Sequence, residues 1–149
     1  MAIYGLRVVS FIFAALAFVP AGAHVFAMFN KLGLDGTSYL AAQRAYDGWS
    51  LFGIVVLGAL LSTAALAVLL YRSGGAFGLV ALAFIAIGAT QFAFWTFTFP
   101  VNRATSNWTM LPDNWEVLRR QWEYSHAAAA CLNALALLLL FLSALRRVG

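Results

Sequence analysis

The sequence predicts an all-α fold, an integral membrane four-helix bundle made of two helical hairpins with long ordered loops on one side. Three observations support this fold class. The chain has 149 residues, of which 64% are hydrophobic and 9% charged, whereas soluble domains are nearer half apolar and a quarter charged. Its mean hydropathy is +0.88. Four apolar runs are long enough to cross a bilayer, and runs of this length without alternation form helices.

The composition also excludes several classes of protein. A water-soluble globule, a disordered chain, a collagen and a coiled coil all have more polar or more periodic sequences. The net charge of +4 does not indicate a nucleic-acid partner, because the basic residues are scattered and several flank apolar runs. Cys131 is the only cysteine, which excludes membrane thiol enzymes that need a Cys-x-x-Cys pair.

The four spans are expected at about residues 6–29, 49–71, 76–99 and 122–145. Together they form a single transmembrane domain over residues 1–149. The first span resembles a signal peptide, because Arg7 and an apolar stretch precede the small residues 21–23. Apolar residues resume at 25–29, so we expect an uncleaved membrane helix instead. Pro20 predicts a kink or a loosened hydrogen bond within this helix.

Small residues in the second and third spans predict close approach between helices. They are Gly53, Gly58, Ala59, Gly78 and Gly88. A glycine or alanine removes side-chain volume from the contact, so two helices that meet there can lie closer together.

The connections between the spans are unequal. Residues 72–75 form a tight turn, while residues 30–48 and 100–121 are longer and polar. An even number of spans places both termini and the tight turn on one side, and both long loops on the other. The terminal side carries Arg7, Arg72, Arg146 and Arg147. The loop side has five basic residues, so a count of basic residues does not decide the orientation. Because all five acids lie on the loop side, we expect cytoplasmic termini in a bacterial inner membrane.

The second long loop is expected to be ordered. It contains Trp108 and Trp115, which are unfavourable to leave in water. Residues 112–116 indicate the start of a helix, with Asp113 or Asn114 as the cap. This helix then continues into the fourth span.

Two histidines lie near the loop side at similar depth. His24 is in the last turns of the first span and His126 in the first turns of the fourth. Arg119, Trp122 and His126 recur at i, i+3 and i+7 and share one helix face. Glu123 is placed to pair with Arg119 at i, i+4. Ionisable groups inside a membrane usually face the bundle interior and serve a function, although a structural hydrogen-bonded pair is the alternative here.

Aromatic residues with a polar atom gather at the same end. They are Tyr39, Tyr46, Trp49, Trp95, Trp108, Trp115, Trp122 and Tyr124. One explanation is the interfacial belt, in which such rings lie at the depth of the lipid headgroups. A belt occupies both faces, but the terminal side has only Tyr4 and Tyr71. The asymmetry favours an aromatic pocket beneath the long loops.

Two sites with a metal remain open as alternatives. Glu123 and His126 have the Glu-x-x-His spacing of bundle di-iron proteins, and His24 with Asp47 would complete a ligand set. Those proteins use two such motifs, and this chain has one. The second alternative is a haem held by His24 and His126, which requires the first and fourth spans to be neighbours.

A third interpretation, a pocket for a hydrophobic small molecule without a cofactor, uses more of the observed residues. The ligand-binding residues would be Gln43, Tyr46, Trp49, Trp95, Trp108, Trp115 and Trp122. His24 or His126 would act as the base, since imidazole exchanges protons near neutral pH. Arg119 and Asn102 would stabilise the oxyanion that develops.

Several of these residues stand in longer segments that form a recognisable set. The segments are Phe99-Pro100-Val101-Asn102, Asn107-Trp108, Pro112-Asp113-Asn114-Trp115, Leu118-Arg119-Arg120-Gln121-Trp122 and His126. They resemble a family of small four-helix membrane proteins of largely unknown function, whose fungal members include anthrone oxygenases of polyketide pathways. The first half is similar to a bacterial branch of that family in Gly22-Ala23-His24, Asn30-Lys31, Tyr39, Gln43 and Tyr46-x-Gly48-Trp49.

The resemblance implies a four-helix bundle and, if the fungal activity carries over, cofactor-free oxygenation of an acidic aromatic carbon. Asn102, Arg119 and Trp122 fall on matching motif positions. Where the bacterial branch commonly has an acid soon after the histidine, this chain has Ala27. A charge relay at His24 is therefore not expected from the resemblance.

The sequence also allows functions without catalysis. The fourth span is rich in alanine, which suits association with a second copy or a partner subunit. A lipid or ligand binder and an accessory subunit are therefore alternatives to an enzyme. Transport is less favoured, because no charged residue lies at mid-membrane to couple an ion gradient.

Overall fold

A computed structural model describes residues 2–146 and contains four long helices, so the predicted all-α four-helix bundle is confirmed. They are α1 (Ala2–Leu32), α3 (Phe52–Leu69), α4 (Gly75–Ala93) and α6 (Trp115–Ala144). The described residues include no strand. Arg147, one of the arginines expected to flank the fourth span, lies outside the described range.

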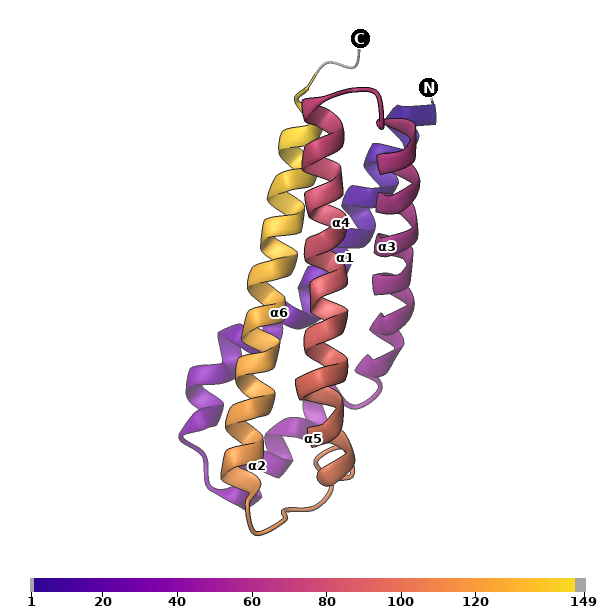
Figure 1. Ribbon diagram of the computed structural model, residues 1–149. Coiled ribbons are helices and arrows are strands. Elements are labelled where there is room, and N and C mark those ends of the chain that lie inside the picture. The colour runs from indigo at the N-terminus through magenta and orange to yellow at the C-terminus, as the bar shows by residue number, and fades with distance from the viewer. Residues whose placement is uncertain (1, 147–149) are drawn as a thin grey trace.

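The helices form a closed square in which each packs against two neighbours. Helix α1 contacts α3 and α6, and α4 contacts the same two helices. Both termini and the α3–α4 turn lie at one end, which we call the terminal end (Figure 1). The short helices α2 and α5 lie at the opposite end, which we call the loop end (Figure 1). The first and last long helices are therefore neighbours, as a site shared by His24 and His126 requires.

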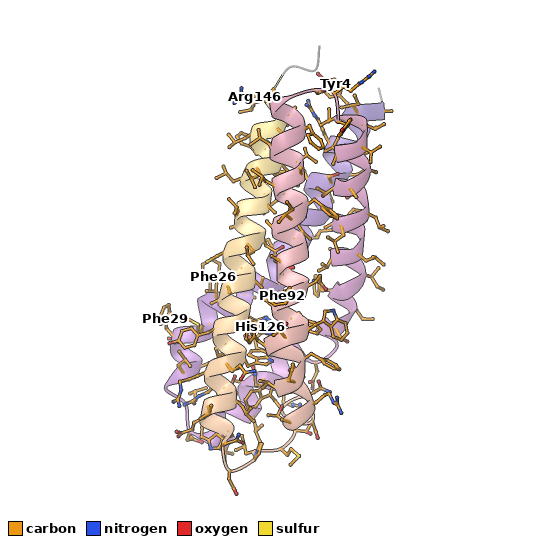
Figure 2. The ribbon with its side chains drawn as sticks, in the orientation of Figure 1. Tyr4, Phe26, Phe29, Phe92, His126 and Arg146 are labelled. Carbon is orange, nitrogen blue, oxygen red and sulfur yellow. The ribbon has the colours of Figure 1, made fainter. Side chains whose placement is uncertain are left out.

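By length and composition the chain is an integral membrane protein. Four helical stretches are long and apolar enough to cross a membrane: Ala2–Leu32, Trp49–Leu69, Ala76–Ala104 and Trp115–Ala144. Helix α1 extends beyond the predicted first span and ends at Leu32, while α6 begins at Trp115, in the segment whose helix was expected to continue into the fourth span. Large apolar side chains cover the outside, and Phe26, Phe29 and Phe92 are exposed by 78%, 77% and 68% (Figure 2). Such a surface is stable against lipid and unstable in water.

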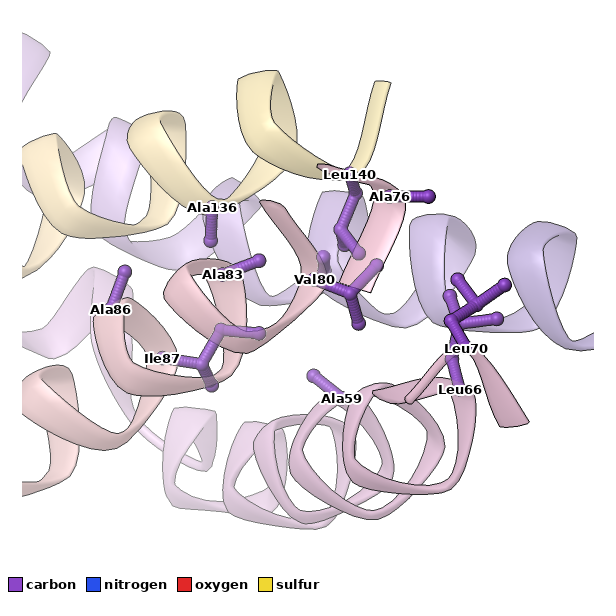
Figure 3. Close-up of a cluster of buried hydrophobic side chains, with 11 residues drawn as sticks. Ala59, Leu66, Leu70, Ala76, Val80, Ala83, Ala86, Ile87, Ala136 and Leu140 are labelled. Atoms are coloured by element: carbon purple, nitrogen blue, oxygen red, sulfur yellow. The ribbon is translucent and has the colours of Figure 1, made fainter. Parts of the chain in front are cut away.

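The terminal half of the bundle is held together by small and aliphatic side chains. Ala59, Ala83 and Ala136 are fully buried there and pack with Val80 and Leu140 (Figure 3). Alanines at these positions let the helix backbones approach closely, so dispersion contacts between small side chains and backbone atoms hold the helices together.

One of the four glycines predicted to allow close helix approach does so. A Cβ added at Gly58 would come within 2.5 Å of the Phe13 ring, because α3 packs tightly on α1 at that point. The prediction is wrong for Gly53, Gly78 and Gly88, where an added Cβ would meet nothing within 4 Å.

The terminal end is closed by hydrogen bonds between chain ends. Arg7 of α1 donates to the carbonyls of Ser143, Ala144 and Arg146 at 3.1–3.3 Å. The last carbonyls of a helix lack partners inside the helix and carry partial negative charge, so a guanidinium there stabilises the end of α6.

Pro20 does not interrupt α1, which continues as an α-helix through it. An irregularity occurs instead before Pro100. Residues 94–98 form a π-helical turn, η3 (Phe94–Thr98), in which the amide of Phe99 donates to the carbonyl of Phe94. Gln121 of α6 donates to the carbonyl of Phe97 at 2.9 Å. The wider turn joins α4 to α5 (Phe99–Ala104) and leaves a carbonyl available to bind α6.

The long loops are ordered, as expected, but they also contain helices that the sequence analysis did not predict. The first loop holds α2 (Gly36–Gln43) and the 3-10 turns η1 (Arg44–Tyr46) and η2 (Trp49–Leu51). Asp35 caps α2 by accepting hydrogen bonds from the amide and hydroxyl of Ser38, and these bonds lower the pKa of its carboxyl. In the second loop α6 begins at Trp115, as predicted, although its cap residue Asn114 makes no side-chain bond.

Candidate functional site

The two histidines meet inside the loop half of the bundle. Their ring centroids are 4.1 Å apart with an angle of 32° between the planes. Figure 2 places His126 in the half of the bundle that ends in α2 and α5. His24 is buried, and its Nδ1 atom and the Nε2 atom of His126 are buried without a hydrogen-bond partner. Two basic nitrogens are thus held side by side in an apolar environment.

Aromatic rings enclose the histidine pair on several sides. Tyr46 lies 4.1 Å from the His24 ring, and Trp49 lies 5.7 Å from it. Trp122 touches both histidines, with ring-centroid distances of 4.8 Å to His24 and 4.2 Å to His126. Edge-to-face contacts such as these direct ring hydrogens toward neighbouring π faces and fix the imidazole planes.

Next to these rings lies a buried ion pair that joins α1 to α6. Lys31 Nζ is 2.9 Å from Glu123 Oε1, and both side chains are almost completely buried. The hydroxyl of Tyr39 donates to the same oxygen at 2.8 Å, and Gln43 Nε2 donates to the Tyr39 hydroxyl at 3.1 Å. A buried pair of charges is stable only when further hydrogen bonds support it, and α2 supplies them here.

Burial and the nearby carboxylate also act on the two tyrosines of the first loop. Loss of solvation raises the pKa of the Tyr39 hydroxyl, and the negative charge of Glu123 raises it further. The same two causes raise the pKa of Tyr46. Both phenols therefore remain protonated at neutral pH, and Tyr39 serves as a hydrogen-bond donor to Glu123.

The predicted oxyanion partners Arg119 and Asn102 are used to hold the site together. Arg119 donates to the carbonyl of Leu34 at 2.6 Å, and its guanidinium lies 4.6 Å above the Trp115 ring. Asn102 accepts a hydrogen bond of 2.7 Å from the indole nitrogen of Trp122. Glu123 pairs with Lys31, so the expected Arg119–Glu123 pair is not present among the salt bridges of the described residues.

The remaining predicted ligand-binding residues lie in different surroundings. Tyr46, Trp49 and Trp122 surround the histidines, and Gln43 supports the ion pair through Tyr39. Trp108 and Trp115 pack against Tyr39 at 4.8 Å and 6.3 Å, in a second cluster with Trp122. Trp95 is 60% exposed and stacks on Phe94 and Phe99 at the outer surface, away from the pocket to which it was assigned.

Trp108 is buried by a strained turn. Ser106, Asn107 and Trp108 have φ values of 48°, 56° and 58°, a left-handed conformation that non-glycine residues rarely adopt in succession. Thr105 Oγ1 accepts from the Trp108 amide at 3.0 Å, and the Asn107 amide donates to Asn102 at 2.7 Å. These bonds offset the strain and turn the indole inward, next to Tyr39 and Trp122.

The structure does not bring together the expected metal ligands. Asp47 is exposed and pairs with Arg44 at 3.4 Å, while Glu123 pairs with Lys31. Within residues 2–146, no group of three or more His, Cys, Asp or Glu residues is arranged to hold a metal ion. A haem between two axial histidines needs ring centroids about 6 Å apart, because each iron–nitrogen bond is about 2 Å long. The observed 4.1 Å is too short for that arrangement.

A shallow hollow of about 230 Å³ opens at the surface of the loop end. Leu40, Ala41, Arg44, Trp108 and Thr109 line it, between α2 and the left-handed turn. The histidines do not line this hollow. The pocket that was expected at the histidines therefore does not coincide with this hollow, and aromatic rings pack on both imidazoles.

Sequence reasoning assigned Lys31 to a loop and left Tyr39 out of the site residues, although both are central to it. A signal for Lys31 was present: His24, Met28 and Lys31 recur at i, i+4 and i+7, and all three are buried on one face of α1. Tyr39 and Gln43 have the same i, i+4 relation on α2. His24 and Lys31 on this face of α1 lie against Trp122, Glu123 and His126 of α6.

Comparisons of the chain with protein-family models, with curated proteins and with solved structures find no match.

Proposed function

We propose that the protein is a membrane enzyme that acts on a hydrophobic aromatic or quinol-like small molecule at the histidine pair. The observation that carries the proposal is the presence of two buried, unpartnered imidazole nitrogens, His24 Nδ1 and His126 Nε2, among aromatic rings. Buried polar atoms are normally hydrogen-bonded, and exceptions concentrate where a ligand or catalytic chemistry uses them.

The chemistry proposed for this site is proton removal. A neutral imidazole in an apolar environment accepts a proton from a hydroxyl, or from a carbon whose anion is delocalised over aromatic rings. The second imidazole lies beside the first, with ring centroids 4.1 Å apart. The resemblance to anthrone oxygenases suggests molecular oxygen as the co-reactant of the resulting anion, and such a reaction needs no metal or haem.

Tyr46 and Trp49 offer a route of entry to the site. They cover His24 from two short turns, η1 and η2, on either side of Gly48. Gly48 has a φ of 83°, a conformation that favours glycine. We propose that this segment moves to let a ring from the bilayer replace Tyr46 and Trp49 against the histidines.

The proposed cellular location and membrane orientation rest on the apolar helices and the distribution of charged residues. We propose a bacterial inner membrane, with the termini in the cytoplasm and the loop end on the opposite side. The support for this orientation is that Arg7, Arg72 and Arg146 at the terminal end have no acidic neighbours, whereas the five acids lie toward the loop end. The partners are the lipid bilayer and the small-molecule ligand, with no nucleic acid. Enzymatic reporters of membrane sidedness, fused to the C-terminus and to residue 109, would test the orientation. A given reporter is expected to be active at one of the two positions and inactive at the other.

The experiment that tests the enzyme combines binding and turnover. Purified protein in lipid nanodiscs is mixed with an anthrone and with a quinol, while tryptophan fluorescence and oxygen consumption are recorded. We expect quenching of fluorescence and turnover that falls by about 10²–10⁴-fold in the His24→Ala, His126→Ala double variant. Trp95→Phe is the matched control, because Trp95 lies at the outer surface. Absence of both quenching and turnover with either compound would contradict the proposal.

A second candidate is a non-catalytic subunit that binds a partner or a second copy. Helix α6 leaves Ala128, Cys131 and Ala134 exposed, a smooth stripe suited to helix association in a membrane. In this case the histidine pair is structural. The two candidates differ in their response to Ala134→Leu, which would change the oligomeric state in detergent only if the stripe is an interface.

A further inference from the structure

The buried cation nearest to the histidine pair is Lys31. Its Nζ atom lies 4.7 Å from the centroid of the Tyr46 ring and 5.1 Å from that of Trp122. The same two rings touch the histidines, Tyr46 at 4.1 Å from His24 and Trp122 at 4.2 Å from His126. The ammonium group and the two imidazoles therefore lie around one pair of aromatic rings.

Lys31 also has hydrogen-bond donors that its ion pair does not use. An ammonium group has three N–H donors, and Lys31 Nζ, although it lies 2.9 Å from Glu123 Oε1 in the ion pair, makes no hydrogen bond of regular geometry. Glu123 Oε1 is shared with the hydroxyl of Tyr39, and the second oxygen of Glu123 is buried without a donor. The carboxylate thus holds Lys31 from one side and leaves the side toward the rings available.

The other cations at the loop end are less suited to meet a ligand anion at the histidines. Arg119 is fixed to the carbonyl of Leu34 and to the face of Trp115. Arg44 is about half exposed and pairs with Asp47. Arg103 and Arg120 are exposed.

Resting on the proposed function, we infer that Lys31 holds the oxyanion that forms when the histidine pair takes a proton from the ligand. The O–H bond of the ligand breaks, its electron pair remains on the oxygen, and the proton moves to an imidazole nitrogen. The ligand class is then a hydrophobic ring with one ionisable hydroxyl, and an ether of the same shape binds without this stabilisation. An unpaired anion in a low-dielectric interior is strongly unfavourable, so a cation beside it decides whether the anion forms.

The test uses a chromophore as the probe, a 4-nitrophenol with a long alkyl chain, whose neutral and anionic forms absorb at different wavelengths. Its apparent pKa is measured in phosphatidylcholine nanodiscs with and without the protein. We expect the wild-type protein to favour the bound anion by about tenfold, which lowers the apparent pKa of the probe by about one unit.

Three variants separate the role of Lys31 from its structural role. The double variant Lys31→Met, Glu123→Gln removes both charges and is expected to lose the preference for the anion. Glu123→Gln alone keeps a bond partner for Tyr39 and removes the competing carboxylate, so the preference is expected to rise. Arg120→Met, which removes an exposed positive charge from α6, the helix of Glu123, is the matched control and should behave like the wild type.

The outcomes distinguish this inference from the proposed function. If a folded double variant keeps the wild-type preference, or if Glu123→Gln lowers it, Lys31 is not the partner of the anion. The double variant leaves no unpaired charge, so its result stands by itself where Glu123→Gln alone does not fold. Failure of both the nitrophenol and its methyl ether to change the tryptophan fluorescence of the wild type contradicts the proposed function itself. Binding of both compounds without a preference that depends on Lys31 contradicts only the inference.

Discussion

The two halves of the bundle use the same four helices in different ways. In the terminal half, alanines and aliphatic side chains fill the interior, and the hydroxyl of Ser62 donates to the carbonyl of Gly58 at 2.7 Å. In the loop half, the buried side chains of His24, Lys31 and Glu123 and the half-buried His126 lie among aromatic rings. In the terminal half, small side chains let the helix backbones approach closely and fill the interior. The loop half holds large aromatic rings and ionisable groups. Under the proposed function, a ligand displaces some of the rings and exchanges a proton with the ionisable groups.

The largest expected effect comes from breaking the ion pair of the loop half. Lys31→Met leaves the Glu123 carboxylate buried without its cation, and we expect a loss of about 3–5 kcal/mol in the free energy of unfolding. Unfolding in mixed micelles with increasing dodecyl sulfate, followed by circular dichroism, measures the loss.

The double variant Lys31→Met, Glu123→Gln is the control for that measurement. It removes both charges and should recover most of the lost stability, because no unpaired charge remains. Equal destabilisation by the single and double variants would mean that the pair contributes through packing and not through charge.

The next effect tests the close packing of the terminal half. Gly58→Ala places a methyl group against Phe13, and we expect a loss of about 1–3 kcal/mol because an added Cβ would come within 2.5 Å of the ring. Gly88→Ala is the matched control, since it meets nothing within 4 Å and should gain up to about 1 kcal/mol from helix propensity. Similar unfolding curves for the two variants would show that the α1–α3 contact is not tight.

A comparable or smaller effect is expected from the amide that positions Trp122. Asn102→Ala removes the acceptor of the 2.7 Å bond from the indole and leaves a buried N–H unsatisfied, at a cost of about 1–3 kcal/mol. We also expect altered tryptophan fluorescence, because Trp122 loses its fixed orientation against both histidines. Asn30→Ala, at an exposed position of α1 with no side-chain bond among the described contacts, should leave the spectrum unchanged.

The smallest effect is a dependence of stability on high pH. The pKa of Tyr39 is raised in the folded state, so its contribution is complete below about pH 10, where an unfolded tyrosine ionises. As the pH rises from there toward the higher folded pKa, the unfolded state loses protons first and stability falls. Unfolding experiments between neutral pH and high pH should reveal this decrease, and Tyr39→Phe should reduce it. An equal slope in the variant would assign the decrease to other groups.

Much of the loop half could be anticipated from spacing along single helices. The i, i+3, i+7 stripe of α6 placed Trp122 and His126 on one face, and the even number of spans placed His24 at the same depth. The closed square of helices then brings the two histidines together. Hydropathy does not reveal pairing between helices, however, and the role of Lys31 was hidden because its position at the end of an apolar run resembled an interfacial anchor.

The roles of Arg119 and Asn102 show a second limit. Their residue types fit an oxyanion site, and the family resemblance favoured the same assignment. In the structure one donor of Arg119 bonds to the carbonyl of Leu34, its Nε atom has no partner, and the acceptor oxygen of Asn102 bonds to the Trp122 indole. Which partner satisfies a polar group depends on elements far apart in the sequence, so composition and motif spacing cannot assign it.

The sequence by itself determined the all-α class, the four apolar helices and the end of the bundle at which polar chemistry collects. These features follow from local properties: the length of apolar runs, helical periodicity and the cost of placing charges in an apolar medium. Only the tertiary structure decided that Lys31 pairs with Glu123, that Tyr39 supports the pair from α2, and that the histidine rings lie 4.1 Å apart. Those contacts join α1, α2 and α6, and they depend on how the helices pack, because a side chain is satisfied by whatever group the packing brings within hydrogen-bond distance.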